Sequence, residues 1–263
     1  MRDITCRFCG SESQQYFSST ILCKYEVKYF RCDTCECLQT EEPFWLSEAY
    51  ASNIADDDTG AVDRNLTNIA NVAVFCKLLE VLTCLDYGAS DGILVRSLRD
   101  FGIDAYGFER HASLKYARRY RHGQLREYDL LCAFEVIEHF DNPAYEIEQM
   151  RSLNPKLLLF TTGIFQNQLA DWPYLAPRFG QHIFFLSVKG VVLLGEMLNM
   201  QMFQLGPYLL GVRRDQLNVM GNQLVVMQRL FRSFSAASIR SLGLSINTLG
   251  ILRDHYQVRE LTE

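Results

Sequence analysis

The sequence predicts an α/β protein built around a doubly wound, mostly parallel sheet and preceded by a small cysteine-rich module. Short apolar segments alternate with segments of helical periodicity between residues 81 and 213, a pattern typical of parallel strands joined by crossover helices. Several of these apolar segments end in a polar residue. Six of the nine cysteines lie within the first 37 residues, which sets the N-terminal module apart.

Composition limits the size of the core and the class of partner. The chain has 263 residues, of which 48% are hydrophobic, enough for one large α/β domain and a small module. The formal net charge of −5 argues against nucleic acid as a partner. No apolar stretch has the length of a signal-peptide core or of a membrane span, so we expect a cytoplasmic protein without a membrane partner.

The N-terminal module contains two Cys-x-x-C pairs separated by 22 residues: Cys6, Cys9, Cys32 and Cys35. Each pair directs two thiolates at one point, and four sulfur ligands suit a tetrahedral structural zinc with no open position for catalysis. Alternation at residues 16–18 and 25–31 predicts the strands of a zinc ribbon. Two alternatives stay open: the cysteines are reduced and have lost their metal, or Cys37 competes with Cys35 as a ligand.

We expect four parts in the chain. Residues 1–40 form the zinc-ribbon-like module, 41–80 a connector with a packing helix, 81–213 the α/β domain, and 214–263 a C-terminal helical extension and tail. The amphipathic helix of this extension packs either on the domain itself or on a second copy of the chain, so a homo-oligomer is one expected assembly.

Periodicity and turn residues predict the individual elements. The expected strands cover residues 81–86, 105–109, 128–134, 157–163, 202–205 and 208–212. The expected helices cover residues 43–50, 65–80, 92–101, 112–120, 144–153, 188–198 and 217–234. Gly102 is placed to end a helix, while Ser187, and either Asn142 or Asp141, are placed to cap helix starts.

Polar groups stand at the carboxyl ends of the expected parallel strands. Asp86, Glu109, Glu135 and residues 161–163 occupy such ends, which meet at one edge of a parallel sheet. The glycine-bearing turn at residues 86–92 lets backbone N–H groups approach a ligand, and an acidic residue ending the second strand can bind ribose hydroxyls. A tight connection without a ligand is the alternative. The pattern favours a nucleotide-like ligand at this edge.

The glycine turn, Glu109, and the segment Phe-Glu-Val-Ile-Glu-His-Phe-Asp-Asn-Pro at residues 134–143 together resemble class I S-adenosylmethionine-dependent methyltransferases. The four-cysteine module and residues 180–187 are similar to zinc-containing sugar C-methyltransferases. The resemblance covers residues 6–212. It implies a Rossmann-like domain with S-adenosylmethionine as cosubstrate and structural zinc.

The resemblance also implies a set of cofactor-binding residues: Asp86, Tyr87, Gly88, Ala89, Gly92, Glu109, Arg110, Phe134 and Glu135. Asp86 and the small residues of the turn would hold the methionine part of the cofactor. Glu109 would bind the ribose hydroxyls, and Phe134 and Glu135 would line the pocket beside the sulfonium.

The sequence departs from the family pattern at three places. Ser90 replaces the middle glycine of the turn. Residues 121–127 leave little chain for the usual third strand, so strand three is predicted to be short or missing and the adenine wall to be reduced. Phe179 and Gln181 stand where sugar C-methyltransferases carry a tyrosine and a glutamate, so only His182 remains there as a candidate base.

His182 and His139 are therefore the candidate catalytic residues. A general base is needed where the methyl acceptor is a hydroxyl or a carbon acid. The alternative roles are structural, with His182 a hydrogen-bonded loop residue and His139 a residue that orients the turn after a strand.

The sequence thus predicts an S-adenosylmethionine-dependent methyltransferase that acts on a small molecule, with a sugar or nucleotide-sugar as the candidate acceptor. Two alternatives remain. The shortened third strand is compatible with a methyltransferase-like binding or scaffold protein that has lost activity. An RNA methyltransferase is the other alternative, because zinc ribbons occur in that class as well, although the acidic net charge disfavours it.

Overall fold

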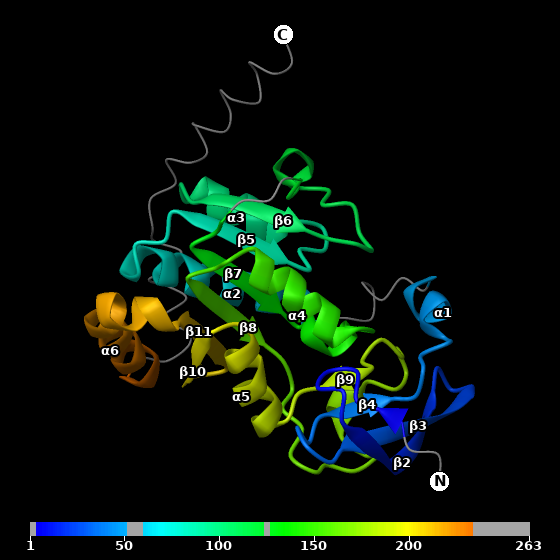
Figure 1. Ribbon diagram of the computed structural model, residues 1–263. Helices are drawn as coiled ribbons and strands as arrows, with labels where there is room; N and C mark the ends of the chain where they lie inside the picture. Colours follow the sequence, from blue (N-terminus) through cyan, green and yellow to red (C-terminus); the bar gives the residue numbers. More distant parts are fainter. Residues whose placement is uncertain (1–3, 52–59, 124–126, 234–263) are drawn as a thin grey trace. The chain divides into compact units, whose positions relative to one another are not determined.

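The computed structural model in Figure 1 describes residues 4–51, 60–123 and 127–233. Its contacts divide the chain into two compact units assembled from segments distant in sequence. The first unit comprises Met1–Asp57, Phe134–Ser152 and Phe160–Met202; the second comprises Asp58–Ala133, Leu153–Leu159 and Phe203–Glu263. The N-terminal residues therefore fold together with segments from the middle of the chain.

The first unit contains an antiparallel sheet in the order β1-β2-β3-β4-β9. Its strands are β1 (Ile4–Thr5), β2 (Glu12–Ile21), β3 (Tyr25–Cys32), β4 (Leu38–Thr40) and β9 (Phe184–Phe185). β2 and β3 form the hairpin that the alternation near residues 16–18 and 25–31 predicts. β4 pairs with β9, so a strand from late in the chain completes the N-terminal sheet.

Aromatic side chains fill the core of the first unit. Tyr29, Trp45 and Phe185 are almost fully buried, and the Trp45 indole N–H donates to the Gly180 carbonyl oxygen over 2.8 Å. A large ring whose polar atom is satisfied in this way packs without a desolvation penalty for the N–H group.

Among its described residues, the first unit has the α-helices α1 (Leu46–Ala51), α4 (Pro143–Ser152) and α5 (Val188–Met197). The Ser187 hydroxyl accepts a hydrogen bond from the Gly190 N–H at 2.8 Å. The Asn142 side-chain oxygen accepts one from the Tyr145 N–H at 3.2 Å. Both predicted helix caps are confirmed, with Asn142 making this bond to the start of α4.

Most residues of a six-stranded sheet, in the order β10-β11-β8-β7-β5-β6, lie in the second unit. Its strands are β5 (Thr83–Tyr87), β6 (Asp104–Phe108), β7 (Leu130–Phe134), β8 (Leu157–Thr161), β10 (Met200–Leu205) and β11 (Tyr208–Arg213). β5 pairs in parallel with both of its neighbours, β6 and β7. The predicted α/β class with a mostly parallel sheet is confirmed.

The sheet ends at β6, where the third strand of the family pattern would follow. Among the described residues, the chain beyond β6 adds a single parallel bridge, between Gly107 and Arg121. The Arg121 guanidinium donates to the Glu109 carbonyl oxygen over 2.7 Å. Strand three is thus reduced to one residue in this part of the chain, as the short segment at residues 121–127 predicts.

The helix predicted over residues 112–120 is wrong. Only the last three of these residues form a turn of 3-10 helix. The Leu114 N–H donates to the Ser90 carbonyl oxygen at 3.2 Å, and the Tyr116 N–H donates to that of Asp91 at 2.9 Å. Because these N–H groups bind the glycine turn instead of carbonyls one helical turn earlier, the segment is an irregular loop packed on the turn.

The second unit also contains α2 (Ala61–Leu78), α3 (Ile93–Asp100) and α6 (Leu217–Ser233). The Phe231 ring of α6 lies 5.4 Å from the Phe75 ring of α2 and 6.3 Å from the Tyr208 ring of β11. The apolar face of α6 therefore packs on its own unit, and the predicted tail after this helix lies outside the described residues. Within the described chain, no helix combines the length and the apolarity that a membrane crossing needs.

Candidate cofactor and metal sites

The turn after β5 is fixed to the end of β6. Gly88 and Gly92 both adopt the left-handed backbone conformation that favours glycine, with φ of 83° and 82°. The N–H groups of Gly88 and Ala89 donate to the Phe108 carbonyl oxygen at 2.8 and 3.0 Å. These two N–H groups hold the turn on β6, so recognition of a ligand at this turn depends on other groups.

Glu109 holds the same turn through its side chain and is only 8% exposed. One carboxylate oxygen accepts from the Ser90 N–H at 2.7 Å, and the other accepts from the N–H groups of His111 and Ala112 at 2.6 and 3.3 Å. A carboxylate offers about four acceptor positions. Three backbone bonds therefore leave roughly one position for a further donor.

Asp86 lies in β5 and is 6% exposed. Burial raises the pKa of its carboxyl group to about 7, and the charge of Glu109 adds to this shift. A side chain with this pKa is balanced between its neutral and ionised forms near neutral pH, and a cationic ligand group at the site would favour the ionised form.

Two glycines allow the loop at residues 112–117 to approach the turn closely. A Cβ atom at Gly107 would lie 2.7 Å from a methyl carbon of Leu114, and one at Gly92 would lie 2.9 Å from the Cβ of Ala117. Real side chains do not tolerate such distances. The sequence therefore needs glycine at both positions for the loop to cover the turn.

Tyr87 and Arg110 both contact the Phe108 ring. The Tyr87 ring lies 4.7 Å from it, and the Arg110 guanidinium carbon lies 5.6 Å from its centre. Tyr87 is buried, whereas Arg110 is exposed. Of these two residues predicted to bind the cofactor, Tyr87 is thus part of the packing and Arg110 offers its charge at the surface.

In the first unit, the segment after β7 carries a second group of polar side chains. The half-buried Phe134 ends β7, and Glu135 follows it with φ of 53°. The Glu135 N–H donates to the Thr161 carbonyl oxygen at 3.1 Å. A left-handed conformation at a residue other than glycine is costly and is retained only where the surroundings hold it, which is a feature of functional segments.

Glu138 is fully buried in the short 3-10 helix Ile137–His139. Its carboxylate accepts hydrogen bonds from the hydroxyls of Tyr174 and Thr162, at 2.5 and 3.0 Å. The Tyr174 oxygen also lies 2.8 Å from a carboxylate oxygen of Glu135. Burial, and then the charges of Glu138 and Glu135, raise the pKa of Tyr174 far above its usual range. The phenol therefore stays protonated between two carboxylates.

The structure brings His139 and His182 together. Their ring centres lie 4.9 Å apart at an interplanar angle of 87°. The Nδ1 atom of His139 lies 3.1 Å from the Gln181 carbonyl oxygen, and that of His182 lies 2.6 Å from the Tyr174 carbonyl oxygen. Because a carbonyl only accepts, these contacts assign the proton of each neutral ring to Nδ1 and the lone pair to Nε2.

Sequence patterns do not identify Tyr174 and Thr162 as members of this group. The signal that was available is the aromatic and proline-rich loop at residues 172–177, because a long loop after a strand often covers a site. In the structure the Tyr174 ring packs on Gly163, where a Cβ atom would overlap it.

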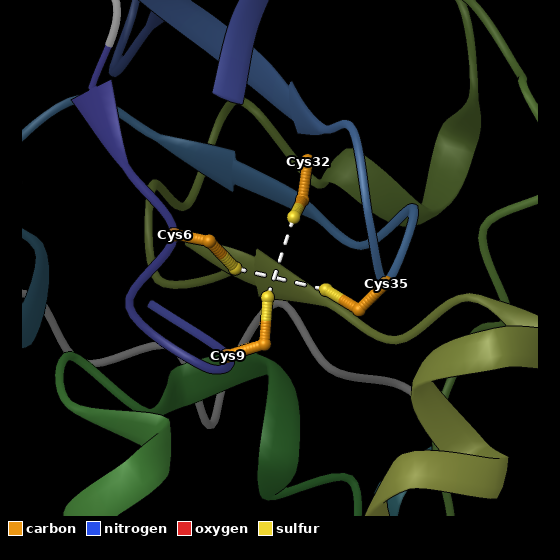
Figure 2. A group of neighbouring side chains, drawn as sticks. All are labelled: Cys6, Cys9, Cys32 and Cys35. Atoms are coloured by element: carbon orange, nitrogen blue, oxygen red, sulfur yellow. Dashed lines mark hydrogen bonds between the residues drawn. The ribbon is translucent and has the colours of Figure 1, made fainter. Parts of the chain in front are cut away.

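The N-terminal cysteines form a third group, shown in Figure 2. The sulfur atoms of Cys6 and Cys35 lie 3.7 Å apart, and those of Cys9 and Cys32 lie 3.4 Å apart. All four sulfurs lie within 4.8 Å of one another. Zinc bound to four sulfurs at ~2.3 Å needs sulfur separations of about 3.8 Å. The cluster therefore has the dimensions of a tetrahedral metal site.

Cys37 lies outside this group of four. Its sulfur atom occupies the space where a Cβ atom of Gly190 would stand, so Cys37 packs against the start of α5. The backbone around Cys35 is held separately, because the Ser187 hydroxyl donates to the Cys35 carbonyl oxygen at 2.5 Å. The fourth cysteine of the group is thus Cys35 and not Cys37.

A model of a known protein family matches the chain. Residues 59–201 fit the family model described as Methyltransferase domain, which is more than half of the chain. No curated protein matches the sequence.

Solved structures align with part of the chain. Magnesium protoporphyrin IX methyltransferase (ChlM) from Synechocystis PCC 6803, solved with bound SAH, is 16% identical with a TM-score of 0.46, and the alignment covers 64% of this chain and 92% of that one. Streptomyces venezuelae DesVI is 14% identical with a TM-score of 0.47, covering 61% and 98%. Mitomycin 7-O-methyltransferase MmcR is 16% identical with a TM-score of 0.39, covering 56% and 52%, so this chain spans about half of its length.

Proposed function

Because the chain belongs to the methyltransferase-domain family, we propose that it transfers a methyl group from S-adenosylmethionine to a small-molecule acceptor. The observation that carries this proposal is the family match over residues 59–201, which includes the glycine turn, Glu109 and the segment at residues 134–143. Methyl transfer is an in-line displacement, so most of the rate arises from positioning the cofactor and the acceptor.

The nine residues predicted from the sequence stay the proposed cofactor-binding residues, and seven of them lie in the second unit. Two features support the proposal there. The ionised form of Asp86 is accessible near neutral pH and would pair with the amino group of the methionine part. Glu109 keeps roughly one acceptor position for a ribose hydroxyl. The single bridge at Arg121 offers little chain for an adenine wall.

Structural zinc is proposed for the four-cysteine group. The sulfur separations support it, as does the chemistry of the thiols. The hydrogen bond to Cys35 and burial raise the pKa of the Cys6 thiol far above its usual range, whereas a bound cation would hold it as thiolate. Four reduced thiolates suit a cytoplasmic location.

His182 and His139 are the proposed catalytic residues. The lone pair on each Nε2 can take a proton from a hydroxyl or a carbon acid as the methyl group is transferred. Both side chains are only half-buried, which leaves them open to an acceptor molecule.

A sugar or nucleotide-sugar is the proposed acceptor, because the cysteine module and residues 180–187 are similar to those of sugar C-methyltransferases. The reduced third strand favours one competing function, a methyltransferase-like binding protein without activity. The net charge of −5 disfavours an RNA substrate.

We also propose that the chain can form a homo-oligomer. The candidate contact surface is on α6, where Val219, Val225 and Val226 are exposed.

Isothermal titration of the full chain with S-adenosylmethionine tests cofactor binding. We expect saturable heat, and its absence at high micromolar protein would contradict the proposal. Incubation with labelled S-adenosylmethionine and separate panels of sugars, nucleotide-sugars and RNA then tests the acceptor. Label in a small-molecule product supports the proposed function, label in RNA supports the RNA alternative, and cofactor binding without transfer to any panel supports the binding-protein alternative.

A further inference from the structure

The group formed by Glu138, His139 and His182 has the composition of a second metal site. One ligand atom from each of these three residues lies within 4.8 Å of the other two. All three residues belong to the first unit. The short 3-10 helix Ile137–His139 supplies two of them, and the segment before β9 supplies the third. None of the four cysteines of Figure 2 takes part, so this group is chemically distinct from the proposed zinc cluster.

The two histidines are prepared for coordination. Metal-binding histidines typically donate the second ring N–H to a carbonyl or carboxylate, which fixes the tautomer and the ring orientation. The Nδ1–H groups of His139 and His182 both point to backbone carbonyls, those of Gln181 and Tyr174. In the neutral form of either ring these contacts place the lone pair on Nε2, and this is the form that binds a cation.

The carboxylates of Glu138 and Glu135 are not held in ion pairs by other described residues. Glu138 is fully buried, and within the described part of the chain neither it nor Glu135 forms an ion pair with a lysine, arginine or histidine. The Tyr174 hydroxyl has one proton for both. The hydroxyls of Tyr174 and Thr162 satisfy hydrogen bonds of Glu138 but carry no charge. A buried carboxylate without an opposite charge is costly, and a bound cation lowers that cost.

Glu138 and His182 are close without bonding to each other. Their ligand atoms lie within 4.8 Å but form neither a hydrogen bond nor an ion pair. A direct carboxylate–imidazole bond is the usual arrangement of a structural pair, whereas ligands held apart around a common point suit an ion of about 2.1 Å bond length.

We infer that Glu138, His139 and His182 bind a divalent first-row transition cation, with Glu135 beside it and Tyr174 holding both carboxylates in place. Two imidazoles and a carboxylate suit Mn²⁺, Fe²⁺, Co²⁺ or Zn²⁺ better than Ca²⁺, which takes oxygen ligands. Three protein ligands leave open positions for a small oxygen donor. The inference rests on the proposed function for its purpose and replaces the proton-accepting role of the two histidines. With each Nε2 lone pair bound to the cation, the cation would polarise the acceptor in their place.

Mn²⁺ binding to the full chain tests the inference by electron paramagnetic resonance of the free ion. The chain is first given one equivalent of Zn²⁺, which the four thiolates take in preference to the histidines, and excess zinc is removed. Thiolates bind Mn²⁺ weakly, so the cysteine cluster does not contribute to the measured Mn²⁺ uptake. We expect saturable uptake of one Mn²⁺ per chain by the wild type, and affinity lowered by more than about tenfold in His182→Gln and in His139→Gln. His111→Gln, a change at an exposed histidine in the second unit, is the matched control and should bind as the wild type does.

Zinc content and the melting temperature identify any variant that fails to fold. Glu138→Gln is then an independent test, because it replaces a proposed ligand with a side chain of the same size. No Mn²⁺ uptake by the wild type, or equal uptake by the folded ligand variants, would overturn the inference. Titration with S-adenosylmethionine is measured on the same samples. If the wild type takes up Mn²⁺ but does not bind S-adenosylmethionine, the proposed function is refuted and the metal site is not. If it binds S-adenosylmethionine but takes up no Mn²⁺, the metal site is refuted and the proposed function is not.

Discussion

The Glu109 carboxylate accepts a 2.7 Å hydrogen bond from the backbone N–H of Ser90. This bond joins the loop after β6 to the turn after β5, and two more backbone N–H groups bind the other carboxylate oxygen. The residue predicted to bind ribose therefore also holds the two strand ends together, so its effects on binding and on folding are coupled.

Replacing Glu109 with glutamine should weaken both properties. The amide presents N–H groups to a backbone N–H, which leaves a buried donor unpaired at a cost of about 1–3 kcal/mol. We expect the free energy of unfolding in urea to fall by this amount and the Kd for S-adenosylmethionine to rise about tenfold or more. Glu148→Gln, at an exposed position on α4, is the control and should change neither quantity. Wild-type cofactor affinity in the Glu109 variant would refute its role in binding.

Asp86 should make stability depend on pH. Its pKa of about 7 in the folded chain lies above the ordinary value of 3.8, so the folded state binds the proton more tightly. The resulting stability is fully present below about pH 4 and is lost as the pH rises through about 7, with a span on the order of 2–4 kcal/mol.

Asp86→Asn removes this dependence, because the amide does not ionise. Urea unfolding of both proteins between pH 4 and pH 8 should show the variant gaining stability relative to the wild type as the pH rises. A difference between the two proteins that is constant with pH would contradict the raised pKa.

Hydrophobic periodicity in the sequence was sufficient to predict the strands of the parallel sheet. The strands expected to start near residues 81, 105, 128 and 157 are present and pair in the sheet, and the family match confirms a methyltransferase domain. The helix expected at residues 112–120 failed because its N–H groups bind carbonyls of the turn at Ser90 and Asp91. Periodicity does not register such long-range backbone bonds.

The side-chain group around Glu138 shows the same limit. The segment at residues 134–143 pointed to this place, and His182 was a candidate from its own segment. Their convergence, and the part of Tyr174, depend on how the loop at residues 172–182 folds back, which no local pattern encodes. The cysteine pairs were more informative than the segments around Glu138 and His182, because the Cys-x-x-Cys spacing alone predicts that the four sulfurs meet at one metal site.

Removal of zinc should destabilise the first unit. Cys32 lies at the end of β3, so a bound metal ties the β2–β3 hairpin to the N-terminal loop. We expect Cys32→Ser to lose zinc on metal analysis and the free energy of unfolding to fall by about 3 kcal/mol or more. Cys23→Ser is the matched control, since Cys23 is exposed and lies outside the cluster. Full zinc content in the Cys32 variant would show that the proposed ligand set is wrong.

A methyl group added at Gly107 should disturb the glycine turn. The new Cβ atom would lie 2.7 Å from a Leu114 methyl carbon, 3.0 Å from the Ala89 Cβ and 3.1 Å from a Val95 methyl carbon. Overpacking of this kind costs about 1–3 kcal/mol, which urea unfolding of Gly107→Ala should show, together with weaker cofactor binding. The double variant with Leu114→Ala removes the closest contact and should recover part of the binding.

The control for this change is Gly221→Ala in α6, where an added Cβ atom meets nothing within 4 Å. Alanine is the better helix former, so this variant should be more stable than the wild type by up to about 1 kcal/mol, with unchanged cofactor binding. The comparison separates the loss of space at Gly107 from the general effect of replacing glycine. If Gly107→Ala matched Gly221→Ala in both stability and binding, the close packing of the loop on the turn would be refuted.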